Sequence, residues 1–280
     1  MSGERIVAAR DGLRLFVRDE GPAHGARPLL CLPGLARTGR DFDDLAARLK
    51  SSRRVVRLDM RGRGRSERAP DWRSYVPEIY LDDIRQVVAA LGLGRFVVVG
   101  TSLGGLLGMA LALAMPGALA GLIVNDVGPD VSPDGRARIL EYVGRDRPQR
   151  NWDEAIAELQ RIMPTIGLER PEQWRALAER TFVAGADGLL HVDWDVAIVE
   201  PIRRSGTPPD LWRLWAAVAQ LPVLVIRGAR SDVLSAATFD RMVATKPGVS
   251  TLVLPRAGHA PTLDEPASRQ AIDEFLRHRH

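Results

Sequence analysis

The sequence has little cysteine and little lysine. Its 280 residues include one cysteine, Cys31, inside the apolar run LLCLP. A single cysteine excludes an intramolecular disulfide and a cysteine zinc site, and its apolar neighbours predict a buried side chain rather than a nucleophile. Lys50 and Lys246 are the only lysines among 39 basic residues, so the rest are arginines. These arginines are scattered among acidic residues, so the net charge of +4 does not indicate a nucleic-acid partner.

Long apolar runs are also missing. No run of 18 or more apolar residues occurs, and the opening MSGERIVAARDG has no apolar signal core. These absences predict a cytoplasmic protein with no membrane partner. The sequence contains no metal-ligand spacing, internal repeat or low-complexity segment, so we expect neither a metal nor a cofactor. Hydrophobic residues at 45% and charged residues at 26% are typical of a globular protein.

Strand-like and helix-like segments alternate through most of the chain. The expected strands are 5–9, 13–19, 28–33, 54–59, 95–100, 119–126, 222–228 and 249–255, and the expected helices between them are 41–50, 78–93, 103–116, 235–247 and 265–279. This alternation predicts an α/β fold with a mostly parallel sheet and helices on both faces. The run Val97-Val98-Val99 is apolar at every position, as a central strand requires.

The alternation stops between residues 130 and 219. Helical patterns fill this segment, including starts at Ser132-Pro133 and at Asn151. We therefore predict a core domain from residues 1–129 and 220–280, with a helical cap from residues 130–219. Five of the six tryptophans lie in the cap; most are expected to pack its own core, and Trp194 is the best candidate to line a substrate cavity.

The segment VVVGTSLGGLLG joins a predicted strand to a predicted helix. Its Gly100-Thr101-Ser102-Leu103-Gly104 matches G-x-S-x-G, which in this context holds a serine on a sharp turn at the sheet edge. Flanking glycines let the backbone pass without side-chain clashes. A serine hydroxyl is a weak nucleophile that needs a base and an orienting carboxylate. The pattern therefore predicts Ser102 as a nucleophile.

The expected base is His259, in the loop RAGHAP after the strand at 249–255. Carboxyl ends of parallel strands meet at one edge of the sheet, so His259 and Ser102 are expected to lie together. Two carboxylates end neighbouring strands: Asp232 in the loop after 222–228, and Asp126 at the end of 119–126. We favour Asp232 as the catalytic acid because of the length and setting of its loop, with Asp126 as the alternative.

An oxyanion needs two backbone N–H donors. Leu103, directly after the serine, and Leu35, in the loop PGLAR after the strand at 28–33, are the candidates. Arg37 in the same loop is a candidate to hold a substrate carboxylate, although it could equally be a surface residue.

Five segments together resemble the α/β-hydrolase fold superfamily. They are CLPGLART (31–38), LDMRGRGRS (58–66), VGTSLGG (99–105), RGARSD (227–232) and AGHAPTLDEP (257–266). The resemblance implies an eight-stranded sheet with a helical cap, of the serine esterase and enol-lactonase type. Many members have His-Gly where this chain has Pro33-Gly34, which removes any role of that histidine but not the backbone donor. Members that use an alkyl-enzyme ester have an aspartate where this chain has Ser102, which favours acyl transfer.

The sequence thus predicts a hydrolase that cleaves a small carboxylic ester or lactone through an acyl-enzyme on Ser102. A carbon–carbon bond hydrolase or an acyltransferase of the same fold stays possible. A non-catalytic binding protein is a further alternative, although it would gain nothing from keeping serine, histidine and acid together. Neither the physiological substrate nor the oligomeric state follows from these residues.

Overall fold

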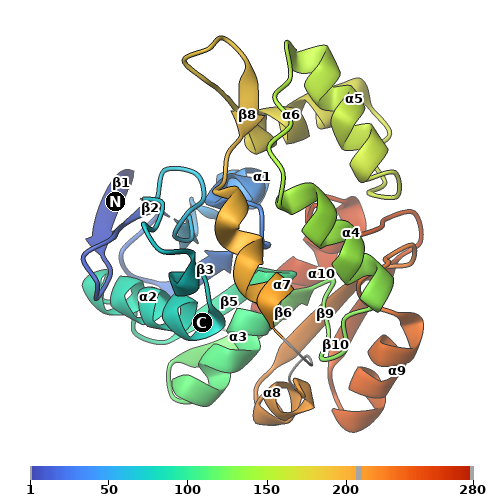
Figure 1. Cartoon of the computed structure of the whole chain (residues 1–280). Coiled ribbons are helices and arrows are strands. Elements are labelled where there is room, and N and C mark those ends of the chain that lie inside the picture. Colours follow the sequence, from blue (N-terminus) through green and yellow to red (C-terminus); the bar gives the residue numbers. More distant parts are fainter. Residues whose placement is uncertain (1, 206–209, 278–280) are drawn as a thin grey trace.

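Figure 1 shows the computed structural model, which describes residues 2–205 and 210–277. Its main sheet has the expected eight strands, and their order is β1-β2-β4-β3-β5-β6-β9-β10. The strands are β1 (Ser2–Ala8), β2 (Arg14–Glu20), β3 (Ala26–Leu32), β4 (Arg53–Leu58), β5 (Phe96–Thr101), β6 (Leu119–Asn125), β9 (Val223–Gly228) and β10 (Ser250–Leu254). The β1–β2 and β2–β4 pairs are antiparallel and the other pairs are parallel. β5 therefore lies in the middle of the sheet, with its carboxyl end at the edge where Ser102 follows.

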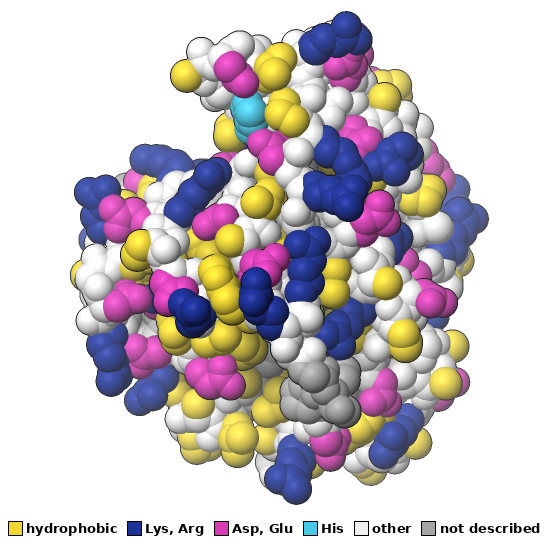
Figure 2. Space-filling view, viewed as in Figure 1, with side chains coloured by type: hydrophobic (Ala, Val, Ile, Leu, Met, Phe, Trp, Pro, Cys, Tyr) yellow, Lys and Arg dark blue, Asp and Glu magenta, His cyan; other side chains and the backbone are white. Residues whose placement is uncertain are grey.

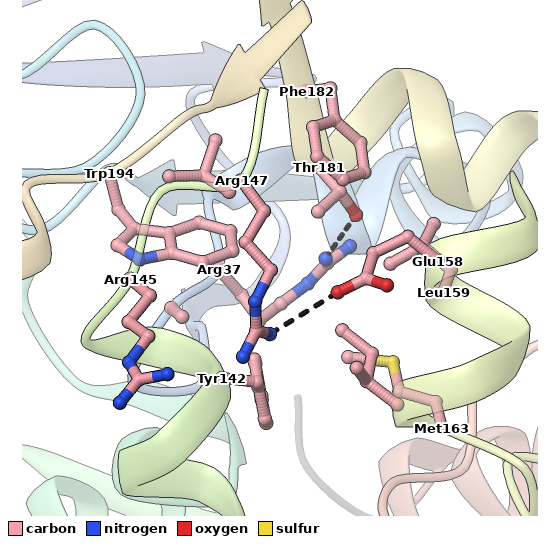
Figure 3. A pocket seen from close by; sticks show the side chains of 13 residues that line it. Arg37, Tyr142, Arg145, Arg147, Glu158, Leu159, Met163, Thr181, Phe182 and Trp194 are labelled. Atoms are coloured by element: carbon pink, nitrogen blue, oxygen red, sulfur yellow. Dashed lines mark hydrogen bonds and ion pairs between the residues drawn. The ribbon is translucent and has the colours of Figure 1, made fainter. Parts of the chain in front are cut away.

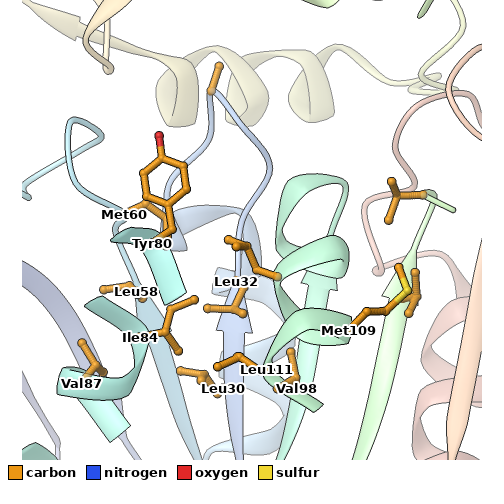
Figure 4. Packing of buried hydrophobic residues seen from close by; sticks show 14 of the residues in the cluster. Leu30, Leu32, Leu58, Met60, Tyr80, Ile84, Val87, Val98, Met109 and Leu111 are labelled. Atoms are coloured by element: carbon orange, nitrogen blue, oxygen red, sulfur yellow. The ribbon is translucent and has the colours of Figure 1, made fainter. Parts of the chain in front are cut away.

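Helices cover both faces of the sheet. The core helices are α1 (Asp43–Leu49), α2 (Pro77–Ala90), α3 (Leu103–Ala114), α9 (Ala236–Thr245) and α10 (Pro266–Arg277). Buried side chains of α2, α3 and α9 pack on one face, and those of α1 and α10 pack on the other. Val98 points to the first face, where Figure 4 shows it beside Leu111 of α3, and Val97 and Val99 point to the second. The all-valine run is thus explained by burial on both sides.

Cys31 of β3 is fully buried among apolar side chains. Burial raises the pKa of its thiol to about 12, so the thiolate does not form near neutral pH.

The segment between β6 and β9 lies largely over the carboxyl edge of the sheet (Figure 1). Its helices are α4 (Pro133–Val143), α5 (Trp152–Ile162), α6 (Pro171–Thr181), α7 (Glu200–Arg204) and α8 (Trp212–Ala217). The predicted starts are present, because Ser132 caps α4 and Asn151 caps α5 through side-chain oxygens. Two features differ from the predicted all-helical cap. A hairpin of β7 (Phe182–Ala184) and β8 (Leu190–Val192) interrupts it, and α8 packs against α3 of the core.

The turn after β4, DMRGRGRS, has a structural role. The buried Asp59 carboxylate accepts hydrogen bonds from the N–H groups of Gly39 (2.8 Å) and Arg65 (3.1 Å). Gly64 passes so close to this carboxylate that a Cβ atom there would clash with it. The turn therefore fixes the loop that follows β3, which also carries Leu35 and Arg37.

Within residues 2–205 and 210–277, no helix is long and apolar enough to span a bilayer. On the face shown in Figure 2, basic and acidic side chains alternate over the surface.

Candidate active site

Ser102 lies on a sharp turn between β5 and α3. Its backbone has φ +52° and ψ −119°, a strained conformation for a residue with a side chain. The turn is held by a hydrogen bond from the Ser102 N–H to the Asn125 carbonyl oxygen (2.9 Å). A Cβ on Gly104 would overlap the carbonyl oxygen of Leu32, and one on Gly100 would overlap that of Gly104. The two glycines of the motif are thus required by close backbone contact, and the bend presents Ser102 at the sheet edge.

His259 lies in the loop after β10 and contacts Ser102. Its Nε2 is 3.0 Å from Ser102 Oγ, and its Nδ1 is 2.8 Å from Asp126 Oδ2. The histidine side chain is 10% exposed and that of Asp126 is fully buried. The structure therefore joins serine, histidine and aspartate in one chain of hydrogen bonds.

Asp126 directly follows β6, and its carboxylate makes three hydrogen-bond contacts. Its Oδ1 accepts from the N–H of Gly228 (2.8 Å), and its Oδ2 accepts from the Ser231 hydroxyl (2.6 Å) as well as contacting His259. The residue has a positive φ of +57°, which is uncommon for a residue other than glycine. These contacts fix the carboxylate oxygen that faces His259.

We predicted that Asp232 is the carboxylate beside His259, and the structure shows that this prediction was wrong. Asp232 forms an ion pair with Arg138 of α4, with Nε–Oδ2 and Nη2–Oδ1 distances of 2.5 and 2.9 Å. Burial alone would raise the pKa of Asp232, but the hydrogen bonds and charge of Arg138 lower it below its usual value. An arginine from the predicted cap thus holds this carboxylate, and the alternative, Asp126, is the partner of His259.

Two polar residues that support the site were not predicted. The Asn125 side-chain amide donates to Thr101 Oγ1 (3.1 Å) and to the Pro261 carbonyl oxygen (2.8 Å), which connects the serine turn to the histidine loop. Ser231 holds Asp126 as described above. The sequence signal for Asn125 was two consecutive polar residues, Asn125-Asp126, at the end of an apolar strand.

Of the two predicted backbone donors, Leu103 directly follows the serine and Leu35 lies in the loop after β3. Leu103 is the first residue of α3, so its N–H has no partner within the helix. In the described part of the chain, neither the Leu103 N–H nor the Leu35 N–H forms a hydrogen bond outside regular secondary structure. Leu35 lines the cavity that contains Ser102. Both donors are therefore free for a ligand oxygen, and the N-terminus of α3 adds a favourable dipole for negative charge.

A cavity of about 110 Å³ opens at Ser102 and His259. Apolar side chains from both the core and the residues 130–219 line most of it: Phe42, Ile139, Met163, Ile166, Leu177 and Leu263. Arg37, Arg180 and Tyr142 supply polar groups to the same cavity. The site is therefore suited to a small, largely apolar molecule with one polar or charged end.

Arg37 is a lining residue of this cavity rather than a surface arginine, with a side chain 12% exposed. Trp194 does not line the cavity that contains Ser102; it lines a smaller adjoining cavity, shown in Figure 3, and donates from Nε1 to the Val143 carbonyl oxygen (2.9 Å). Trp194 is 4% exposed, so its main contacts are packing contacts.

Comparisons with known proteins identify the family of the chain. The model of the alpha/beta hydrolase family matches residues 29–271. The chain belongs to this family. The predicted resemblance, fold class and enzyme class, a hydrolase, are thereby confirmed.

Three relatives cover nearly the whole chain. A 3-hydroxybutyrate-oligomer hydrolase of Cupriavidus necator is 40% identical over 275 residues, which are 94% of this chain and 92% of the relative. The crystal structure of an alpha/beta hydrolase from Novosphingobium aromaticivorans has 46% sequence identity and a TM-score of 0.92, covering 98% of each chain. The structure of E-2-(acetamidomethylene)succinate hydrolase has 25% identity and a TM-score of 0.83, covering 99% of each chain.

Proposed function

We propose that this alpha/beta hydrolase is a serine hydrolase that cleaves a carboxylic ester through an acyl-enzyme on Ser102. The observation that carries the proposal is the chain of contacts from Ser102 Oγ to His259 Nε2 (3.0 Å) and from His259 Nδ1 to Asp126 Oδ2 (2.8 Å). The relative named for 3-hydroxybutyrate oligomers, whose units are joined by ester bonds, supports an ester as the substrate.

In the proposed reaction, His259 Nε2 takes the hydroxyl proton while Ser102 Oγ forms a bond to the ester carbonyl carbon. The negative charge that develops on the carbonyl oxygen is held by the N–H groups of Leu35 and Leu103. The carbon–oxygen bond to the leaving group then breaks, and the proton on His259 passes to the leaving alkoxide. Asp126 keeps the Nδ1 proton of His259 in place and stabilises the imidazolium.

Hydrolysis of the acyl-enzyme repeats these steps with water. His259 takes a proton from water, the resulting hydroxide attacks the acyl carbon, and Ser102 leaves with the proton returned by His259. A lactone would follow the same route, with the leaving oxygen still attached to the acyl group, and would give one hydroxy acid as its only product. We propose esters, including lactones, of small organic acids as the substrate class, because the cavity at Ser102 has a volume of about 110 Å³.

The test is a panel of p-nitrophenyl esters and lactones with the wild type, Ser102→Ala and the exposed control Ser52→Ala. We expect turnover by the wild type and the control, and a loss of at least about 10³-fold for Ser102→Ala. A serine-directed phosphonate should label the wild type at Ser102. Absence of both turnover and labelling would contradict the proposal and favour a binding protein. Faster transfer to an added alcohol than to water would instead indicate an acyltransferase.

A further inference from the structure

Arg37 is held in the cavity of Ser102 by contacts at all three nitrogens of its guanidinium. Nε and Nη2 donate to the two carboxylate oxygens of Asp41 (2.8 and 2.6 Å), and Nη1 donates to Thr181 Oγ1 (2.5 Å). A Cβ on Gly34 would lie 3.4 Å from Arg37 Cγ and 3.6 Å from Ser102 Cβ, so both side chains flank this glycine. Of the five N–H groups of a guanidinium, two have no partner among the described residues. They belong to a guanidinium held in position by Asp41 and Thr181, on a side chain that lines the same cavity as Ser102.

Tyr142 of α4 provides a second donor beside Arg37. Its ring lines the cavity with Ser102 and also the smaller cavity of Figure 3. The Tyr142 side chain is partly buried, and its hydroxyl group forms no hydrogen bond with any residue in the described ranges. Burial raises the pKa of Tyr142, so the phenol stays protonated and can donate. A ligand atom with a lone pair would complete this site.

The smaller cavity adjoins the larger one at Arg37, Tyr142 and Met163, which line both. Its volume of about 20 Å³ admits a group the size of one or two waters, such as a carboxylate. Its lining contains three arginines, Arg37, Arg145 and Arg147. Asp41 is paired with Arg37 and Glu158 with Arg147, so the charge of Arg145 is the one left without an acidic partner among the described residues. The charge balance therefore favours an anion over a cation or a neutral group.

We propose that Arg37 and Tyr142 bind the free carboxylate of an anionic ester, with the carboxylate at the mouth of the smaller cavity and the scissile carbonyl at Ser102. This inference rests on the proposed ester hydrolysis and names its substrate class: short esters in which the alcohol is itself a hydroxy acid with a free carboxylate. The ester carbon–oxygen bond breaks, the acyl group passes to Ser102 Oγ, and the Ser102 proton reaches the leaving oxygen through His259. The released hydroxy acid keeps its carboxylate, so a chain of such units would lose its carboxyl-terminal unit.

The test compares the dimer of 3-hydroxybutyrate as the free acid with the methyl ester of the same dimer. The bond between the two units is the same in both molecules, and only the charge at the far end differs. Hydrogen bonds to a charged group predict a kcat/KM for the free acid that is roughly 10- to 100-fold higher in the wild type, measured as release of 3-hydroxybutyrate or its methyl ester. Tyr142→Phe should lower this ratio about tenfold, mainly through the KM of the free acid.

Two further variants complete the design. Arg37→Gln should bring the ratio close to one, whereas Arg213→Gln, an exposed arginine outside both cavities, should leave the ratio at the wild-type value. Tyr142→Phe removes one oxygen atom, so it remains informative if Arg37→Gln does not fold.

The proposed subsite and the proposed function can fail separately. If the wild type cleaves the two dimers equally well, or Tyr142→Phe leaves the ratio unchanged, the carboxylate subsite is wrong while ester hydrolysis stands. The same holds if p-nitrophenyl acetate is hydrolysed and neither dimer is. If no ester of any kind is cleaved, both proposals are wrong.

Discussion

Replacing Asp126 by Asn tests which carboxylate supports His259. In the wild type, Oδ1 accepts from the Gly228 N–H (2.8 Å) and Oδ2 contacts His259 Nδ1 (2.8 Å). The backbone N–H of Gly228 cannot reverse, so the oxygen of Asn should stay beside it. The NH₂ group would then face His259 Nδ1. Because an NH₂ group donates, Nδ1 would have to accept the hydrogen bond and would carry no proton. His259 would carry its proton on Nε2, where it faces Ser102 and cannot act as a base.

The wrong tautomer should lower kcat by about 10³- to 10⁴-fold, or roughly 4–5.5 kcal/mol of transition-state stabilisation. Asp232→Asn is the matched control. The Arg138 and Asp232 side chains are 30% and 37% exposed, so losing their ion pair should weaken the attachment of α4 by about 1 kcal/mol or less. We expect a change in kcat of less than about tenfold.

The assay is steady-state hydrolysis of a p-nitrophenyl ester near pH 7.5, with thermal unfolding of each variant to confirm the fold. A larger loss for Asp232→Asn than for Asp126→Asn would refute the reasoning. Equal, small losses in both would show that neither carboxylate orients His259.

Two further predictions concern stability. Gly104→Ala places a Cβ against the Leu32 carbonyl oxygen, so we expect urea unfolding to show a free energy of unfolding lower by about 3 kcal/mol or more. Gly117→Ala, where a Cβ meets nothing within 4 Å, should leave the free energy of unfolding nearly unchanged. Equal losses in the two variants would contradict the close backbone contact at Gly104. Burial, followed by repulsion from Asp59, raises the pKa of Asp193 from 3.8 to about 6, so its ionisation destabilises the folded state above pH 6 and not below pH 4. The free energy of unfolding of Asp193→Asn minus that of the wild type should therefore rise by up to about 3 kcal/mol between pH 4 and pH 7.5, and a constant difference would argue against this burial.

The sheet could be predicted because its strands carry unambiguous local signals. Runs such as Val97-Val98-Val99 must be buried on both faces, and helices with apolar stripes separate them. Ser102 and His259 could be predicted for the same reason, since each follows a strand whose carboxyl end lies at one edge of the sheet.

The acid could not be assigned from the sequence. Asp126 and Asp232 follow neighbouring parallel strands, β6 and β9, so topology brings both near His259. The two aspartates differ in their partners, because Asp232 forms an ion pair with Arg138, which lies 94 positions earlier in the chain. No local pattern reports such a contact between a helix of the predicted cap and the core.

Two features of the predicted cap could not be predicted from the sequence. The hairpin of β7 and β8 has strands of three residues each, too short to show an alternating pattern, although Asp187-Gly188 between them is a turn signal. α8 has apolar residues typical of any amphipathic helix, and only the structure shows that they pack on α3.

The most direct test of the proposed mechanism is a pre-steady-state measurement on the wild type with a p-nitrophenyl ester, followed by acid quenching and mass spectrometry of the digested protein. We expect a burst of p-nitrophenol close to one equivalent per chain where deacylation is slow, and an added acyl mass on the peptide that contains Ser102. Turnover with no acyl group on that peptide, or an acyl group on another residue, would contradict the assignment of Ser102 as the nucleophile.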